Sequence, residues 1–110
     1  MDEYYTLGVW RAKEGREDDL VERWKEIGEA FNALPTPPGT GTLIRSIDDP
    51  RLFYSFGPWP SLEAIDEMRA FEPAREAIGR MREVCDEARP GTFRVVARVE
   101  GVGLMDAPGA

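Results

Sequence analysis

A few side chains in this sequence could bind and activate an organic molecule. The stretch RLFYSFGPWPSLEAID at residues 51–66 contains Tyr54 and Trp59. A phenol such as Tyr54 can donate a proton to a substrate oxygen, and an indole such as Trp59 can stack on a planar ring. Asn32 offers an amide that could hold a carbonyl or an enolate. Arg45 and Arg98 are cations that could stabilise a developing oxyanion.

Each of these residues also has a purely structural interpretation. Trp59 lies where a strand gives way to a helix, so it could be a core residue that fixes the helix to a sheet. Tyr54, with aromatic neighbours, could belong to a dimer face. Asn32 could mark a fraying helix end. In a chain with an excess of acidic residues, Arg45 and Arg98 could simply form surface or interface ion pairs. The sequence alone leaves both interpretations open.

Composition limits the classes of partner and of chemistry. The chain has 110 residues, with 14 basic and 21 acidic side chains and a net charge of −7. This balance argues against nucleic acids and anionic membranes as partners, because both are bound mainly by Lys and Arg. No apolar run is long enough to span a membrane, and the start MDEYYTLG lacks a signal-peptide core. We therefore expect a soluble cytoplasmic protein.

The counts of histidine and cysteine restrict catalysis further. There is no histidine and one cysteine, Cys85. The commonest general base, the commonest transition-metal ligand and the usual haem ligand are therefore missing, and we expect neither a metal nor a cofactor. Cys85 falls on an apolar helical stripe, which predicts a buried, inert thiol. The Asp48-Asp49 pair precedes Pro50, which predicts a turn.

Hydrophobic periodicity predicts an α+β fold. Residues 3–11 read as a strand that is apolar on both faces, and residues 16–34 as an amphipathic helix. The remaining pattern predicts a strand at 41–48, a third strand ending at Gly57, a helix after Ser61 that Pro73 breaks or kinks, a second amphipathic stretch from Ala74 to Ala88, and a strand at 92–100. The order β-α-β-β-α-β is a ferredoxin-like arrangement with a four-stranded antiparallel sheet. We expect one domain at residues 1–100 and a C-terminal tail at 101–110.

One face of such a sheet carries no helices. Since the first and third strands are apolar or aromatic on both faces, the bare face would be an association site in a monomer. This predicts a homodimer that forms through the sheet face, with the tail either flexible or packed on the partner subunit.

These residues resemble the antibiotic biosynthesis monooxygenase family. The resemblance lies in Phe53-Tyr54 followed by WPSLEA at 59–64, and in the segments GREDDLVERW and IDDPRLFY, and it extends over about residues 4–100. It implies a dimeric α+β barrel with a pocket between sheet and helices in each subunit, which binds a small aromatic or quinone-like molecule. We expect the pocket to be lined by Trp24, Phe31, Phe56, Met68 and Phe71.

The resemblance also implies a range of activities. Some members of the family oxidise polyketide anthrones with O₂ and without flavin, metal or haem, while others degrade haem or isomerise small molecules. Many relatives carry a histidine in the helix after the tryptophan, whereas this chain has Met68 near that place. The leading hypothesis is a cofactor-independent monooxygenase that acts on a small aromatic or quinone-type substrate. The alternatives are an oxygen-independent isomerase or cyclase, and a non-catalytic dimer that binds a small molecule.

Overall fold

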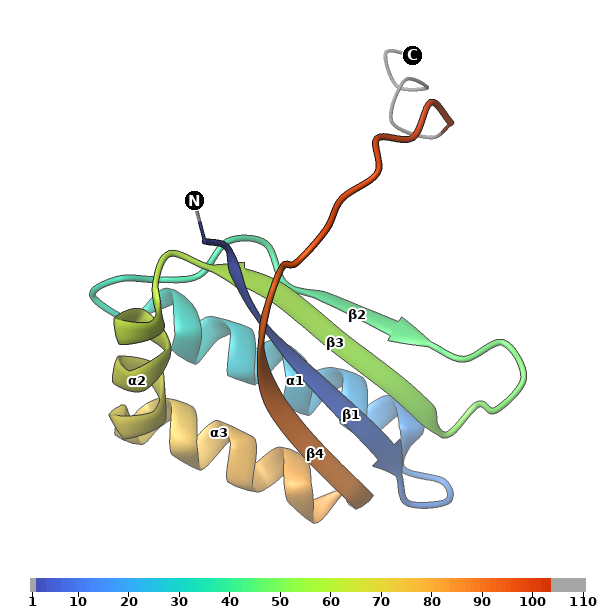
Figure 1. Cartoon of the computed structure of the whole chain (residues 1–110). Coiled ribbons are helices and arrows are strands. Elements are labelled where there is room, and N and C mark those ends of the chain that lie inside the picture. Colours follow the sequence, from blue (N-terminus) through green and yellow to red (C-terminus); the bar gives the residue numbers. More distant parts are fainter. Residues whose placement is uncertain (1, 104–110) are drawn as a thin grey trace.

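The chain folds into a four-stranded sheet and three helices. The computed structural model describes residues 2–103 (Figure 1). The elements in chain order are β1 (Tyr4–Ala12), α1 (Glu17–Asn32), β2 (Thr42–Arg45), β3 (Leu52–Trp59), α2 (Leu62–Ala70), α3 (Glu72–Glu83) and β4 (Cys85–Arg94).

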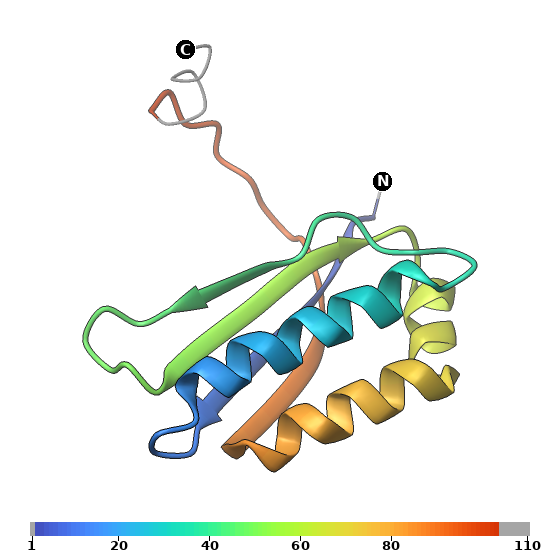
Figure 2. The same ribbon diagram turned by 180° about the vertical axis from the view of Figure 1, so that it is seen from behind.

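The sheet is antiparallel throughout, and its strand order is β2-β3-β1-β4. In Figure 1 the strands cross in front of the helices, and the reverse view in Figure 2 shows the helices in front of the sheet. All three helices therefore cover one face and leave the other face bare. The predicted α+β, ferredoxin-like fold is confirmed.

Helix α1 follows the stripe that the sequence predicts. Its first turn holds Glu17, Asp18 and Asp19, whose negative charge suits the positive end of the helix dipole. Leu20 and Ile27, two turns apart, are buried against the sheet. The helix ends at Asn32, shortly before the proline-rich segment that cannot continue it.

Helices α2 and α3 are separate and meet at Phe71. Ser61 caps α2, because its hydroxyl accepts a hydrogen bond from the backbone N–H of Ala64 at 3.1 Å. Phe71 has an extended backbone, and Pro73 lies in the first turn of α3, where a missing N–H costs nothing. The break predicted at Pro73 is therefore present, and the proline begins a new helix.

The predicted boundary between the last helix and the last strand is wrong. α3 ends at Glu83, and β4 occupies residues 85–94 instead of 92–100. β4 pairs with β1 from Cys85 opposite Ala12 to Arg94 opposite Tyr4. These ladder bonds outweigh the helical spacing of the apolar residues in this segment. Pro90 is tolerated because β4 is an edge strand of the sheet.

Beyond β4 the chain leads away from the sheet (Figure 1). Val96, Val99 and Val102 are 91%, 94% and 86% exposed. Arg98 lies in this segment and forms two hydrogen bonds of 2.7 Å with the carboxylate of Glu3. The ion-pair interpretation of Arg98 is thus confirmed, and its placement in a strand is wrong. Residues 104–110 of the expected tail lie outside the described residues.

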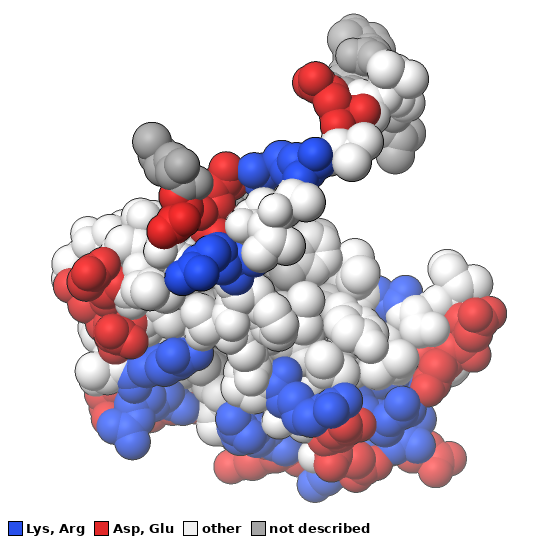
Figure 3. Space-filling view, viewed as in Figure 1, with Lys and Arg blue, Asp and Glu red and all other residues white. Residues whose placement is uncertain are grey.

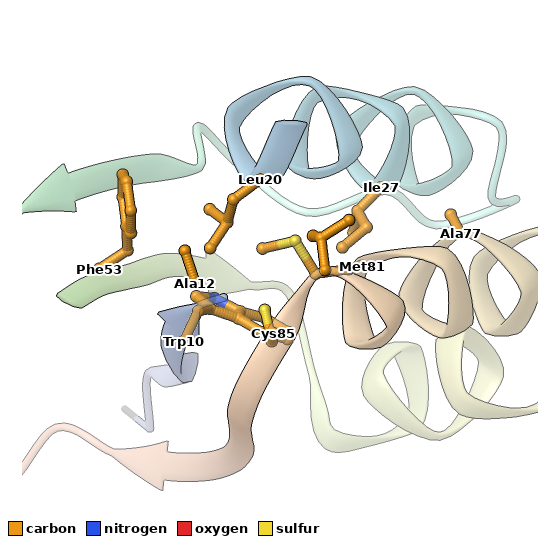
Figure 4. Packing of buried hydrophobic residues seen from close by; sticks show 9 residues of the cluster. Trp10, Ala12, Leu20, Ile27, Phe53, Ala77, Met81 and Cys85 are labelled. Atoms are coloured by element: carbon orange, nitrogen blue, oxygen red, sulfur yellow. The ribbon is translucent and has the colours of Figure 1, made fainter. Parts of the chain in front are cut away.

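The main core lies between the sheet and helices α1 and α3. Leu20 and Ile27 of α1 and Met81 of α3 point toward Trp10 and its strand neighbours (Figure 4). The indole N–H of Trp10 donates a buried hydrogen bond of 2.9 Å to the hydroxyl of Ser55. A Cβ on Gly8 would lie 2.7 Å from the Trp10 ring, so a glycine is required beneath the indole.

The turn between β2 and β3 is held by its own polar groups. The hydroxyl of Ser46 accepts hydrogen bonds from the backbone N–H groups of Asp48 and Asp49. Asp49 accepts a further bond of 2.6 Å from Arg11, which lowers the pKa of Asp49 together with the bond from the Arg51 backbone. The turn predicted at Asp48-Asp49 is confirmed.

Cys85 provides a test of this packing. It begins β4 instead of lying on a helix, and burial, with a smaller effect of Asp86, raises the pKa of its thiol from 9.0 to about 11. At pH 8 we expect iodoacetamide to alkylate the native thiol about 100-fold more slowly than the thiol of the urea-unfolded chain, since so much less thiolate is present. Equal rates would contradict the buried position.

The same raised pKa predicts a pH dependence of stability. The folded state binds the thiol proton more tightly, so this contribution to the free energy of unfolding is present below pH 9 and is lost as the pH rises toward 11. Between these values, wild type should lose more stability than Cys85→Ala in urea titrations. Parallel losses in both proteins would count against the shift.

Candidate functional site

A cleft lies between the inner face of the sheet and helix α1. Its first hollow has a volume of about 510 Å³. The lining comes from three parts of the fold: Trp24, Ile27, Gly28, Phe31 and Asn32 of α1, residues 38–41 of the following loop, and Thr6, Ser55, Phe56, Gly57 and Trp59 of the sheet. A cavity of this size can hold a small organic molecule.

A second hollow of about 340 Å³ adjoins the first toward α3. It shares Thr6, Trp24, Ile27, Phe31 and Ser55 with the first hollow, so the two are parts of one cleft. Its other lining includes Trp10, Met68 and Ile78, and three arginines from α2 and α3.

Aromatic rings form the walls of the first hollow. Phe31 and Trp59 meet edge to face, with ring centroids 5.3 Å apart and planes at 66°. Trp59 is only 5% exposed, whereas Trp24 and Phe31 are half-buried. Rings arranged in this way present flat apolar surfaces on which a planar ligand can stack.

Two hydroxyl groups supply polarity inside the cleft. The indole N–H of Trp59 donates to Thr6 Oγ1, and the indole N–H of Trp10 donates to Ser55 Oγ, both at 2.9 Å. Because each hydroxyl oxygen already accepts a hydrogen bond, its own hydrogen can be directed to a ligand. The two indoles therefore orient a pair of donors that suits a carbonyl or phenolate oxygen.

Gly57 allows the loop at residues 39–41 to close one side of the first hollow. A Cβ on Gly57 would lie 3.1 Å from the carbonyl oxygen of Thr40 and 3.2 Å from the Cα of Gly41. The backbone N–H of Gly39 bonds to the carbonyl of Pro58 at 2.9 Å and fixes the loop on the end of β3. Asn32 and Thr40, both exposed, mark the mouth of the cleft.

The structure brings together six of the residues predicted for the site. Trp24, Phe31, Asn32, Phe56 and Trp59 border the first hollow, and Met68 borders the second. Phe56 does so although strand alternation directs its side chain to the bare sheet face, where it is 36% exposed.

Four predicted residues lie elsewhere. Tyr54 alternates with the inward Phe53 and Ser55, so its side chain lies on the bare face of the sheet. Arg45 donates to the Pro50 carbonyl at 2.8 Å and stacks on Phe53, outside the cleft lining. Arg98 is engaged with Glu3. Phe71 lies at the junction of α2 and α3 and packs against a cluster of buried residues that includes Trp59, Ile65 and Met68.

The sequence-based prediction missed the polar groups of the cleft. Thr6 and Ser55 occupy inward strand positions and have aromatic residues near them in the sequence. A polar residue at an inward position of an apolar strand is unusual, and it could have indicated a binding site. The arginines at 69, 75 and 82 come from two helices, and nothing in their local spacing connects them to a pocket.

Neither a metal cluster nor a membrane span is found in residues 2–103. No group of three histidine, cysteine, aspartate or glutamate side chains there could hold a metal ion. None of the described helices has the length and apolar character needed to cross a bilayer.

Solved structures establish what kind of fold surrounds this cleft. SnoaB, a cofactor-independent oxygenase from Streptomyces nogalater, has a TM-score of 0.77 and 17% identity, with 91% of this chain and 97% of SnoaB covered. An antibiotic biosynthesis monooxygenase has a TM-score of 0.69 at 17% identity, covering 87% and 99% of the two chains. This chain has the antibiotic biosynthesis monooxygenase fold.

The same fold occurs in a protein from Shewanella oneidensis, with a TM-score of 0.73, 17% identity and coverage of 86% of this chain and 91% of that one. No protein-family model matches the sequence. No curated protein matches it either. The resemblance predicted from the residues is therefore confirmed by structure, at the level of the fold.

The hydrogen bond between Trp59 and Thr6 can be tested by a substitution of equal size. Thr6→Val removes the acceptor and leaves the indole N–H of Trp59 without a partner. We expect a loss of about 1–2 kcal/mol in the free energy of unfolding, measured by urea titration. Thr36→Val, at an exposed loop position, serves as the control and should change stability little. Equal effects of the two substitutions would refute this role for Thr6.

Proposed function

We propose that this protein is a cytoplasmic, cofactor-independent monooxygenase that oxidises a small aromatic or quinone-type molecule in the cleft. The observation that carries the proposal is the combination of an aromatic wall with two indole-anchored hydroxyls in one hollow. The likeness to SnoaB supports it, since that protein is a cofactor-independent oxygenase of the same fold.

In this proposal the substrate supplies the electrons. An anthrone loses a proton from its CH₂ group to form an anion, and the hydroxyls of Thr6 and Ser55 stabilise the oxyanion by hydrogen bonding. The anion reduces O₂, and one oxygen atom becomes the new carbonyl while the other leaves as water. Anthrone and O₂ thus give anthraquinone and water, with atoms and electrons balanced.

The residues of the cleft contribute position and a dry environment. Trp24, Phe31 and Trp59 hold the ring system by stacking, which fixes the reacting carbon relative to the hydroxyls. The apolar walls exclude water from the anion, so each hydrogen bond to the oxyanion stabilises it more strongly than the same bond would in water.

We further propose that the bare sheet face forms a homodimer. Apolar side chains from all four strands lie on it: Ile44, Leu7, Val9, Tyr54, Phe56 and Phe93. Figure 3 shows this face as a broad uncharged area, with charged side chains gathered mainly around its edges. A second copy fits such a surface, because a two-fold axis brings the same apolar patch onto itself.

The segment that follows β4 supports the same proposal. Its valines at 96, 99 and 102 are exposed on a stretch of chain that leaves its own sheet. A partner subunit would give these side chains a surface on which to pack.

Oxygen uptake tests the enzymatic proposal. Chelator-treated, flavin-free protein is offered anthrone in an oxygen electrode, and the product is identified as anthraquinone by its absorbance. We expect uptake by the wild type and a loss of about tenfold in kcat/KM for Trp24→Leu, which removes a stacking surface. Ile47→Ser, in an exposed turn, is the control and should match wild type.

Two results would contradict parts of this proposal. Binding of anthrone, seen by quenching of tryptophan fluorescence, without oxygen uptake would favour a non-catalytic binding protein. Uptake that is equal in wild type and Trp24→Leu would place the reaction outside this cleft.

Light scattering tests the dimer. At micromolar concentration we expect a mass twice the 12.4 kDa of one chain. Tyr54→Asp puts a charge in the middle of the apolar face and should shift the mass toward that of one chain. Ile47→Asp, which is 97% exposed outside the sheet, adds the same charge and should leave the dimer intact. A wild-type mass of one chain would refute the proposal.

A further inference from the structure

Three arginines border the second hollow of the cleft. Arg69 lies in the last turn of α2, and Arg75 and Arg82 lie on α3. Arg75 and Arg82 are seven residues apart, so they lie on the same side of the helix, about two turns from one another. No aspartate or glutamate from the described residues borders this hollow. This is notable in a chain where acidic residues outnumber basic ones by 21 to 14.

The guanidinium groups are only weakly neutralised by the protein. Arg69 donates a hydrogen bond to the hydroxyl of Thr92, a neutral group. Arg75 approaches Glu72 only to 3.8 Å, at an exposed site where such pairs contribute little. Within residues 2–103, no carboxylate lies within ion-pair distance of Arg82.

The hydrogen bond from Arg69 also fixes where this positive charge lies. Thr92 is opposite Thr6 in the pairing of β4 with β1, and both side chains lie on the inner face of the sheet. The hydrogen bond to Thr92 therefore holds the guanidinium of Arg69 close to Thr6, one of the two hydroxyl residues of the cleft. Figure 3 shows basic side chains at the edge of the molecule formed by α2 and α3, with acidic side chains beside them.

We propose that the ligand of this cleft is an aromatic acid, whose carboxylate binds in the second hollow between Arg69 and Arg82. This rests on the proposed function, because the ring is taken to lie in the first hollow. The two hollows share five lining residues, so a molecule with rings at one end and a carboxylate at the other can occupy both. Guanidinium groups suit this role because they donate in pairs to a carboxylate.

A pair of probes of nearly equal shape tests the proposal. Anthraquinone-2-carboxylate and the neutral 2-(hydroxymethyl)anthraquinone are titrated into the protein, and binding is measured by quenching of tryptophan fluorescence. We expect the acid to bind about tenfold more tightly at low salt, as charge-assisted hydrogen bonds should allow. This preference should shrink as salt is added.

Matched variants assign the preference to the arginines. Arg69→Gln and Arg82→Gln should each lower affinity for the acid and leave affinity for the alcohol unchanged, whereas Arg82→Lys should keep part of the preference. Arg16→Gln removes a positive charge that is paired with Asp19 at the start of α1, and should behave as wild type. Unchanged thermal unfolding midpoints show that the variants are folded.

The outcomes separate this inference from the proposed function. Equal affinity for the acid and the alcohol would overturn the carboxylate site while leaving the aromatic cleft in place. A preference for the acid that survives in both Arg69→Gln and Arg82→Gln would also overturn it. Failure of both probes to bind would overturn this inference and the proposed function together.

Discussion

The register of β1 against β3 is the constraint on which the core and the cleft both depend. It places Thr6 opposite Gly57 and Gly8 opposite Ser55. Trp10 on one strand can then reach the hydroxyl of Ser55 on the other, and Trp59 can reach Thr6 in the opposite direction. A shift of β3 by one residue would turn Ser55 to the bare face and bring Tyr54 inward, so that the cleft would lose one of its two hydroxyls. One set of backbone hydrogen bonds therefore determines which side chains the cleft contains.

Much of the fold could be predicted from the sequence, because local and tertiary preferences agree. The stripe of α1, the Ser61 cap and the turn before Pro50 each satisfy a local rule and also fit the sheet. In residues 85–88 the local and tertiary preferences disagree: the spacing of the apolar residues suits a helix, whereas the segment pairs with β1 as a strand. Spacing within a segment does not reveal a neighbouring strand that supplies hydrogen bonds, so the start of β4 could not be found in this way.

The candidate site was harder to predict, because strand alternation gives two faces without saying which one the helices cover. Tyr54 and Ser55 are adjacent, and chemistry alone favours the tyrosine as a functional residue. The packing of Phe53 beneath α1 places Ser55 on the cleft side and Tyr54 on the other. The aromatic residues of α1 lie beside the cleft because the helical stripe has one inward direction. Arg69 and Arg82 border one hollow only through the packing of α2 and α3 in the fold, which sequence spacing does not encode.

Gly28 lies within α1 and Gly79 within α3, at points where these helices border the cleft. Glycine within a helix costs about 0.5–1 kcal/mol relative to alanine. Close packing does not require it here, because a Cβ at either position would meet no atom within 4 Å apart from its chain neighbours and the backbone of its own helix. The helices thus forgo some stability and retain empty space along the cleft. At these two positions the cleft is bordered by main-chain atoms, which cannot rotate aside, so one added methyl group at either glycine would narrow the space available to a guest molecule.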